Sequence, residues 1–368
     1  MRVVMRGGTD GLHDAFVELP RTIYADDPFW IPEEEAPLRR AFSSENPWFA
    51  SGRAVTLCIP GRARLAVFRE DDCLIERAPA AWFGFFEAVD DADAVGLLLD
   101  AAGAWARSQG ADILYGPIDF TTLGRYRLRV SAESNAVPFP GEPYNPPYYA
   151  DLLLRAGFGV AREYVTQIGR IKPQPLETKR AVARAVTEAG YTLTSLDGAT
   201  WLAALPELHR KADEIFADSF GYRPVPFAQF AAGYGASVAR RLCARTSVLA
   251  RGPDGDLAGF FLVYPQYGPL VMQGSTLGRV SPSDLSYEAH DPVLASAGVT
   301  DAVGKTVGVC PQHRGRGLMD ALGAAVIGRG VGRYDRWFGA MIRADNPSRR
   351  FGAAHMDVER TYALYSRR

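Results

Sequence analysis

Hydrophobic and polar positions follow the same order of strand-like and helix-like periods in each half of the chain. In the first half, the apolar run Ala80–Val89 predicts a buried strand. Ala92–Gln109 has the spacing of an amphipathic helix, which Gly110 ends, and Ala111–Gly116 predicts a second strand. An Asn-Pro-Pro sequence then opens a predicted helix at Tyr148–Arg155, and a strand comes next at Tyr164–Ile171.

The second half repeats this order after a predicted hairpin, Thr246–Ala250 and Leu257–Tyr264, whose turn is Pro253-Asp254-Gly255-Asp256. The remaining predicted elements are a strand at Thr306–Val309, a helix at Leu318–Ile327, a strand at Trp337–Arg343, a helix opened by Asn346-Pro347-Ser348, and a strand at Arg360–Tyr365. Little residue identity accompanies the repeat. It is a repeat of architecture.

The two halves meet at Arg170–Thr178, which carries two prolines and reads as a linker. We therefore expect two α/β domains, residues 1–172 and residues 173–368. A length of 368 residues agrees with two domains.

Composition narrows the class of protein. The chain has 41 Lys and Arg against 42 Asp and Glu, so its formal net charge of −1 gives no electrostatic case for nucleic acid or an anionic membrane. Lysine occurs at only four positions, Lys172, Lys179, Lys211 and Lys305. The apolar runs are shorter than a membrane helix needs, and the N-terminus lacks the apolar region of a signal peptide, so we expect a cytoplasmic protein.

The four cysteines, Cys58, Cys73, Cys243 and Cys310, are widely spaced. They form neither a CxxC pair nor a Cys/His cluster, so the sequence predicts neither a disulfide framework nor a metal site.

The stretch that carries chemistry is Thr306–Leu318, TVGVCPQHRGRGL. Its core, Gln312 to Gly317, fits a [Q/R]xxGx[G/A] pattern between a strand and a helix. Alternate glycines permit a tight turn and close approach of a ligand to the backbone, and the N–H groups at the start of a helix bind phosphate oxygens. Arg314 and Arg316 can add charge-assisted hydrogen bonds, so this turn is interpreted as a pyrophosphate cradle. A plain glycine-rich turn with solvated arginines is the alternative.

This segment resembles the acyl-CoA-binding signature of the GNAT acyltransferase superfamily. The resemblance implies an α/β (α+β) fold of two GNAT-like domains, each a mixed, mostly antiparallel sheet flanked by helices. It also implies that the C-terminal sheet is splayed to hold pantetheine. The donor-binding residues that it implies are Val307, Val309, Gln312, His313, Arg314, Gly315, Arg316, Gly317, Leu318 and Asn346.

The resemblance extends over nearly the whole chain, to a bacterial group of two-domain GNAT-like proteins. Its further matches include Tyr24, Asp27-Pro28, Phe83-Gly84-Phe85-Phe86-Glu87, Gly116-Pro117, Tyr144-Asn145-Pro146-Pro147-Tyr148-Tyr149 and Gly278-Arg279. These motifs are typical of the group and indicate no particular reaction. Pro143–Tyr149 reads either as the lining of a groove or as a rigid start to a helix.

The first half departs from the signature. Asp90-Asp91-Ala92-Asp93 stands where a cradle is expected, and its carboxylates would repel a pyrophosphate while suiting a helix N-terminus as caps. We therefore expect that the first half has no acyl-donor site.

The second half departs from the GNAT pattern in the residues that would act as general acid and general base. The helix after Asn346 contains Phe351 and Ala353 and lacks the tyrosine that many GNAT enzymes use to reprotonate the leaving thiolate, so His355, Tyr362 or Tyr365 would have to substitute. His290 and Asp291 lie in a long loop predicted at Pro265–Thr300 and are the candidates for a general base. Cys310 reads as a packing residue.

The leading functional expectation is an N-acyltransferase that moves an acyl group from a pantetheine thioester to a small-molecule amine, in a setting such as specialised metabolism. The donor is acyl-CoA or an acyl carrier protein, and no metal is expected. A non-catalytic CoA-binding sensor or scaffold is the alternative, and an aminoacyl-tRNA-dependent transferase is a weaker one because no basic stripe is visible. The acyl group, the acceptor and the oligomeric state do not follow from the sequence.

Overall fold

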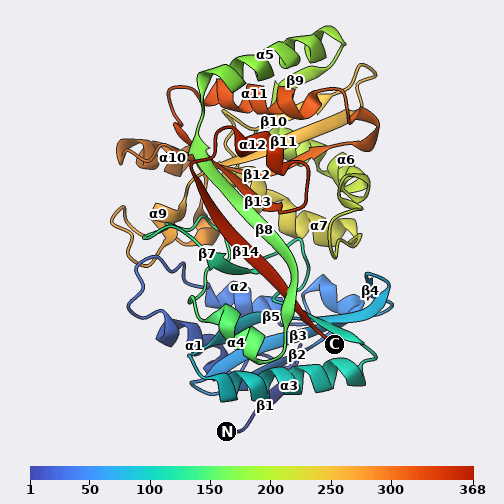
Figure 1. Cartoon of the computed structure of the whole chain (residues 1–368), viewed down its shortest axis with the longest axis vertical. Coiled ribbons are helices and arrows are strands. Elements are labelled where there is room, and N and C mark those ends of the chain that lie inside the picture. Colours follow the sequence, from blue (N-terminus) through green and yellow to red (C-terminus); the bar gives the residue numbers. More distant parts are fainter. The chain divides into compact units, whose positions relative to one another are not determined.

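The computed structural model describes residues 1–368, apart from the side chains of residues 351 and 352, and the chain divides into two compact units (Figure 1). The first unit comprises Met1–Tyr164, Met272–Gly274 and Thr361–Arg368. The second comprises Val165–Val271 and Ser275–Arg360. The division thus falls inside a strand, before the boundary at residue 172 that the sequence suggests, and the end of the chain returns to the first unit.

The first unit contains β1 (Val4–Gly7), α1 (Asp14–Ile23), α2 (Glu35–Ala41), the 3-10 helix η1 (Pro47–Ala50), β2 (Gly52–Ile59), β3 (Ala63–Glu70), β4 (Leu74–Ile75), β5 (Ala78–Ala88), α3 (Ala92–Ser108), β6 (Ile113–Gly116), β7 (Leu128–Ser131) and α4 (Tyr149–Arg155). Its sheet has the order β1-β2-β3-β5-β6-β14, and only β5 and β6 pair in parallel. The residues of β14 (Val358–Arg367) from Thr361 onward complete this sheet beside β6.

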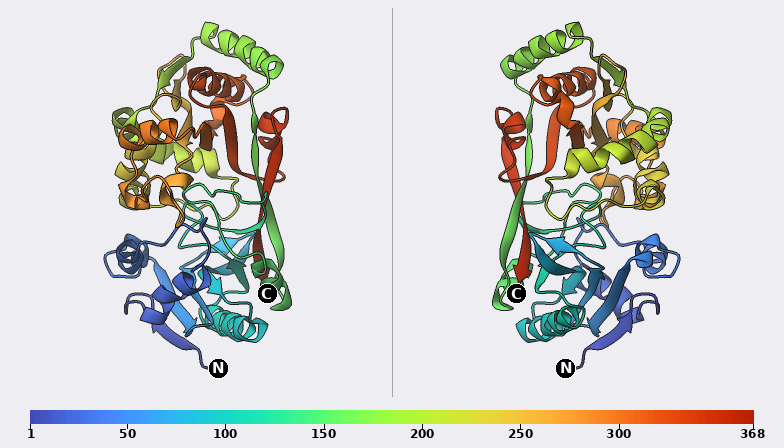
Figure 2. Two further views of the ribbon diagram at one scale, coloured as in Figure 1. Left: turned by 90° about the vertical axis from the view of Figure 1, so that its left-hand side faces the viewer. Right: turned by 90° about the vertical axis from the view of Figure 1, so that its right-hand side faces the viewer.

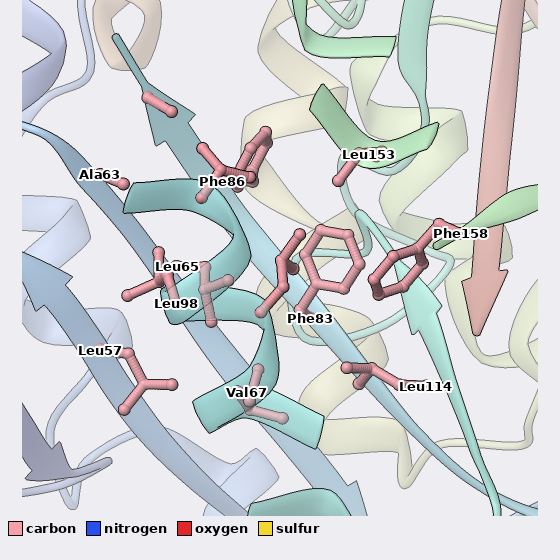
Figure 3. Close-up of a cluster of buried hydrophobic side chains, with 14 of the residues drawn as sticks. Leu57, Ala63, Leu65, Val67, Phe83, Phe86, Leu98, Leu114, Leu153 and Phe158 are labelled. Atoms are coloured by element: carbon pink, nitrogen blue, oxygen red, sulfur yellow. The ribbon is translucent and has the colours of Figure 1, made fainter. Parts of the chain in front are cut away.

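The core of the first unit forms where α3 lies across the sheet. Leu98 of the helix packs among Leu57, Leu65, Val67 and Phe83 of three strands, all of them fully buried (Figure 3). Because strand side chains alternate between faces, these residues share one face of the sheet with the apolar stripe of α3.

The second unit contains the end of β8 (Gly159–Arg170), α5 (Pro173–Glu188), β9 (Thr192–Ser195), α6 (Gly198–Phe216), α7 (Phe227–Tyr234), α8 (Ala236–Arg241), β10 (Val248–Arg251), β11 (Leu257–Pro265), α9 (Gly268–Val271), η2 (Pro282–Asp284), α10 (Tyr287–Ser296), β12 (Asp301–Val309), η3 (Pro311–His313), α11 (Leu318–Gly330), β13 (Arg336–Arg343) and α12 (Arg349–Ala353). Its sheet has the order β8-β13-β12-β11-β10-β9. β12 and β13 pair in parallel, whereas the pairs β12–β11, β11–β10 and β10–β9 are antiparallel.

Both faces of this second sheet are covered. Val248 and Ala250 of β10 face α11, whereas Leu249 between them faces the cluster built on α6 and α8. The helix α5 lies on α11, as the two views in Figure 2 show. The fold class expected from the sequence, a mixed and mostly antiparallel sheet flanked by helices in each half, is confirmed.

The prediction of a linker at Arg170–Thr178 is wrong. Pro173 is the first residue of α5 and Pro175 lies in its first turn, where a missing N–H costs nothing because the first N–H groups of a helix have no intrahelical partner. The prediction of a long loop at Pro265–Thr300 is also wrong, since this segment contains α9 and α10.

Candidate acyl-donor site

The turn between β12 and α11 is built around two glycines in left-handed backbone. Gly315 has a φ of +75° and Gly317 has a φ of +78°, which L side chains rarely adopt. A Cβ on Gly317 would lie 2.6 Å from Cγ1 of Val182, so α5 packs directly on this glycine, whereas a Cβ on Gly315 would meet no atom within 4 Å. The turn therefore requires glycine twice, and Gly315 leaves its surface open.

Two side chains of the turn hold it in place. His313 is 7% exposed, and its Nδ1 lies 3.0 Å from the Tyr191 hydroxyl while its Nε2 lies 3.0 Å from Oδ2 of Asp256. The hydrogen bond with His313 lowers the pKa of Asp256. Arg314 donates through Nε to the Val309 carbonyl and through Nη2 to the Ile215 carbonyl. Both side chains thus bond to other parts of the second unit.

The remaining groups of the turn are open to a ligand. Gln312 is exposed, although its side chain is hydrogen-bonded to Asp256, and the exposed Arg316 forms no hydrogen bond or ion pair with any described residue. Gly317 is the N-cap of α11 and supplies no capping side chain, so the N–H groups of the first helical turn, from Leu318 onward, have no intrahelical partner. This arrangement suits an anion.

The strand before the turn, β12, separates from β13, the strand that follows α11. β12 and β13 pair in parallel only from Asp301–Gly304 with Arg336–Gly339, and their described residues pair nowhere beyond this stretch. On its other edge, β12 stays paired with β11, where Val307 lies opposite Phe261 and Val309 opposite Gly259. The register shifts at Lys305, which is the extra residue of a β-bulge. The backbone of β12 from Thr306 onward therefore lacks a ladder partner on the side that faces β13.

A cavity of roughly 140 Å³ occupies this separation, and its walls are mainly apolar. Lining residues from β12, β13 and α11 include Gly304, Thr306, Val307, Met319, Gly323, Val326, Phe338 and Gly339. Lys179 of α5 and Lys305 of β12 also line it, and Nζ of Lys179 lies 2.5 Å from Oδ1 of Asp320 in the first turn of α11. Two of the four lysines of the chain thus border this cavity.

His355 also lines the cavity. It is 7% exposed, and its Nδ1 accepts a hydrogen bond of 2.9 Å from the backbone N–H of Lys172. An acceptor nitrogen carries no proton, so in the neutral ring the proton is on Nε2. Burial lowers the pKa of His355, and the charges of Lys179 and Lys172 lower it further. His355 therefore presents a neutral ring with an N–H donor at Nε2.

Other residues named from the sequence have different roles. Asp291 on α10 accepts hydrogen bonds from Arg333 at 2.5 Å and from the Tyr334 hydroxyl at 2.9 Å, and Nδ1 of the neighbouring His290 accepts from the Ser286 N–H. In the first unit, Tyr362 donates to Glu142 at 2.6 Å, and Tyr365 is part of the hydrophobic core. None of these four candidates lines the cavity.

Two further residues named from the sequence act on the backbone or in packing. Oδ1 of Asn346 accepts from the Ser348 N–H at 2.9 Å, which shapes the chain before α12. Cys310 is fully buried, and burial raises the pKa of its thiol to about 11, which favours the packing role.

The sequence pattern identified the turn but missed several residues that line the cavity. The glycines carry a visible spacing signal, whereas Lys179, Lys305 and Trp337 belong to no motif. The rarity of lysine in this chain is the one sequence signal that points to Lys179 and Lys305.

The equivalent place in the first unit is filled by the chain itself. β5 and β6 pair in parallel over Ala80–Trp82, after which the Ile118 N–H donates to the Phe83 carbonyl at 2.7 Å. Oδ1 of Asp119 accepts from the Phe85 N–H at 2.7 Å. A Cβ on Gly84 would lie 2.2 Å from the Ile118 carbonyl oxygen, so the loop leaves no room beside this strand.

The acidic stretch of the first unit caps a helix. Asp91 is the N-cap of α3, and its side chain accepts a hydrogen bond from the Ala94 N–H. Among the described residues, no group of three or more His, Cys, Asp or Glu side chains is placed to hold a metal ion. Within the same residues, no helix has the length and apolar character that would let it cross a membrane.

Comparisons of the sequence with known proteins find one partial relative. No protein-family model matches the sequence. Protein YghO of Escherichia coli K12 is 29% identical over 159 residues, which are 39% of this chain and 38% of YghO, so the match spans well under half of either protein.

Solved structures match over the whole chain. A tandem GNAT protein from the clavulanic acid biosynthesis pathway superposes with a TM-score of 0.55 at 14% identity, over 100% of this chain and 98% of that one. A GCN5-related N-acetyltransferase from Anabaena variabilis gives a TM-score of 0.52 at 10% identity, over 100% of this chain and 72% of that one. At this level of identity, the likeness shows the fold.

Proposed function

Because the chain has a tandem GNAT-like fold, we propose that its second unit is an acyltransferase site, which moves an acyl group from a pantetheine thioester to the amine of a small molecule. The observation that carries the proposal is the separation of β12 from β13 after Gly304 and Gly339, over an apolar cavity beside an open, glycine-rich helix start. The thioester donor is either acyl-CoA or the phosphopantetheine arm of an acyl carrier protein.

Each part of the site suits one part of such a donor. The free N–H groups at the start of α11, with Arg316, match a pyrophosphate. The unpaired edge of β12 from Thr306 to Val309 matches the amides of a pantetheine arm, which can hydrogen-bond as an added strand. The apolar walls exclude water from the thioester end.

The reaction needs no covalent enzyme intermediate. The amine nitrogen attacks the thioester carbonyl carbon, a C–N bond forms, the C–S bond breaks, and the proton lost by nitrogen balances the one gained by sulfur. Positioning the two reactants supplies much of the acceleration. The backbone N–H groups of β12 can stabilise the developing oxyanion, and the Nε2–H of His355 can donate to the leaving sulfur.

A non-catalytic CoA sensor is the second candidate, and one observation favours it. His290, Asp291, Tyr362 and Tyr365 all lie outside the lining of the cavity. A sensor needs the turn and the cavity but no acid or base.

The test is amine-dependent release of thiol from a panel of acyl-CoA thioesters, from acetyl to octanoyl, with a panel of small amines. We expect one free thiol for each amide formed with at least one donor and amine pair. Tight CoA binding without thiol release from any pair would favour the sensor. Absence of CoA binding would contradict the sensor, and absence of thiol release from an acyl carrier protein thioester as well would contradict both candidates.

A further inference from the structure

A second, polar cavity lies wholly within the first unit. Its volume is about 30 Å³, which is room for about two water-sized groups. It is bordered by the end of β5, the loop from Pro117 to Leu128, and Pro143–Asn145. The polar side chains that line it are Glu87, Asp119, Arg125, Tyr126, Arg127, Tyr144 and Asn145.

Four of these side chains have their hydrogen bonds satisfied by the protein. Asp119 accepts from the Phe85 N–H at 2.7 Å and from Nε of Arg125 at 2.9 Å. Arg125 also pairs with Glu33 at 3.1 Å. The Tyr144 hydroxyl donates to Asp27, and the Asn145 side chain bonds to the backbone N–H and carbonyl of Arg129. These residues build the walls.

Glu87 is different because one of its oxygens is unused. The side chain is 4% exposed, and Oε2 accepts hydrogen bonds from the Tyr24 hydroxyl at 2.8 Å and the Tyr149 hydroxyl at 2.7 Å. Oε1 has no hydrogen-bond partner among the described residues. A buried carboxyl with a free oxygen that borders a cavity can accept a hydrogen bond from a ligand.

Arg127 is the cation without an ion pair in the same cavity. It is 6% exposed, and its guanidinium stacks on the rings of Tyr126 and Tyr164 at 3.6 Å and 3.9 Å from their centroids. Nη2 donates to the Tyr126 hydroxyl, Nε is buried without a partner, and the side chain forms no ion pair with a described residue. A buried guanidinium without a counter-charge favours a carboxylate.

The backbone around the cavity is unusual as well. Phe85 has a φ of +52° and Arg127 has a φ of +87°, and such values are rare for bulky residues. The register of β5 against β3 shifts between Arg64 and Ala66, which places a bulge beside Glu87. Bulges and strained backbone are concentrated at binding and active sites, where they direct side chains.

We propose that this cavity binds the ammonium and carboxylate groups of a small zwitterion, an amino acid, with Glu87 accepting from the ammonium and Arg127 donating to the carboxylate. A free carboxyl oxygen and a guanidinium without an ion pair complement these two charges, and the rest of the ligand extends outward. The inference goes beyond the proposed function, because the site lies in the first unit and needs no acyl donor.

The first test is titration calorimetry of the full chain, without CoA, against each of the twenty amino acids, with methylamine and acetate as probes that carry one charge each. We expect at least one amino acid to bind with one equivalent per chain, and to bind at least tenfold more tightly than either single-charge probe. Binding of none, or equal binding of methylamine or acetate, would overturn the proposal.

The matched variants are Glu87→Gln and Glu142→Gln. Glu142 is also a buried carboxyl of the first unit, but it bonds to Tyr362 and does not line the cavity. We expect Glu87→Gln to weaken amino-acid binding tenfold or more and Glu142→Gln to leave it unchanged. Equal effects of the two substitutions would contradict the assignment.

A measurement on the unmodified chain keeps the test independent of folding of the variants. The groups that face Glu87 are Tyr24, Tyr148, Tyr149, Glu33, Arg64 and Arg125. Burial raises the pKa of Glu87 to about 7, the charge of Glu33 adds to the shift, and Arg64 and Arg125 oppose it. The tyrosines stay neutral, and Glu33 and Arg125 stay ionised, at neutral pH.

An ammonium on Glu87 favours the ionised carboxylate, so binding at pH 7 should release about half a proton. Calorimetry in two buffers of different ionisation enthalpy measures this release. Binding without proton release would overturn the role of Glu87. None of these readouts involves CoA, so their failure would leave the proposed donor site untouched, and loss of CoA binding would leave this site untouched.

Discussion

Two histidines of the second unit differ in how many of their ring nitrogens are bonded to the protein. Both ring nitrogens of His313 lie within hydrogen-bonding distance of protein groups, the Tyr191 hydroxyl and the Asp256 carboxylate. His355 uses only Nδ1 in this way and borders the cavity. The sequence motif contains His313, whereas the histidine that borders the cavity is His355, which comes after α12 and belongs to no motif.

His355→Asn tests this role, because the asparagine Oδ1 can keep the hydrogen bond with the Lys172 N–H while the Nε2–H is lost. We expect kcat to fall about tenfold to a hundredfold while KM for the donor stays within about twofold. The control is His209→Gln, since His209 is bonded to the Val225 carbonyl and lies outside the cavity lining. An unchanged kcat in His355→Asn would assign His355 a structural role alone.

Gly315→Asp tests the anion site at the turn. A carboxylate at this open position would repel a pyrophosphate, so CoA affinity should fall about a hundredfold or more, which is about 3 kcal/mol. The matched control is Gly332→Asp, because Gly332 also has a positive φ of +81° with open space around its Cβ position. Calorimetry with CoA is the measurement, and thermal melting should show similar losses of stability in both variants. Equal CoA affinity in the two variants would place the pyrophosphate elsewhere.

Glu87 makes the stability of the first unit depend on pH. Burial raises its pKa from 4.5 to about 7, so the stabilisation it contributes is fully present below pH 4.5 and is lost as pH rises through 7. Relative to Glu87→Gln, the unmodified chain should lose about 3 kcal/mol of unfolding free energy across this window. Urea unfolding at pH 5 and pH 8 measures this difference. If the unfolding free energy of the unmodified chain rises with pH relative to that of Glu87→Gln, the carboxyl is instead stabilised in its ionised form.

At the scale of elements, the two units differ in what lies beside their parallel strand pair, which is β12 and β13 in the second unit and β5 and β6 in the first. In the second unit, β12 and β13 separate and leave an apolar cavity. In the first unit, the chain after β6 returns to bond with Phe83 and Phe85, and so it closes the equivalent gap. The same architecture thus carries one open gap and one filled gap.

This difference predicts a pattern of amide exchange. CoA should slow hydrogen exchange in Thr306–Val309 and in the first turn of α11, because it would supply partners to backbone groups that lack them. Phe83–Glu87 should exchange at the same rate with and without CoA. Protection of β5 on addition of CoA would contradict the asymmetry between the units.

The sequence predicted the elements with strong periodicity and missed those whose signal depends on tertiary context. The helix at Ala92–Ser108 was predicted to within a residue, because its apolar stripe ends at a glycine. The sequence predicts a linker where α5 begins, since prolines at positions 173 and 175 mark a turn as readily as a first helical turn. Asp91 as a cap followed from helix chemistry, whereas the free oxygen of Glu87 depends on two tyrosines that are distant in sequence.

At the scale of the whole molecule, the repeat of the sequence is not a repeat of self-contained halves. β8 and β14 are each divided between the two units, so each sheet is completed by a segment from the other half of the sequence. We therefore expect the two units to be difficult to separate by cutting the chain after residue 172.

The central claim is that the chain holds one acyl-donor site, in the second unit. Titration calorimetry of the unmodified chain with coenzyme A tests it most directly. The structure predicts one equivalent per chain, and in Gly315→Asp about a hundredfold weaker binding while Gly332→Asp keeps the affinity of the unmodified chain. Two equivalents per chain, or one equivalent that Gly315→Asp leaves unchanged, would contradict the claim.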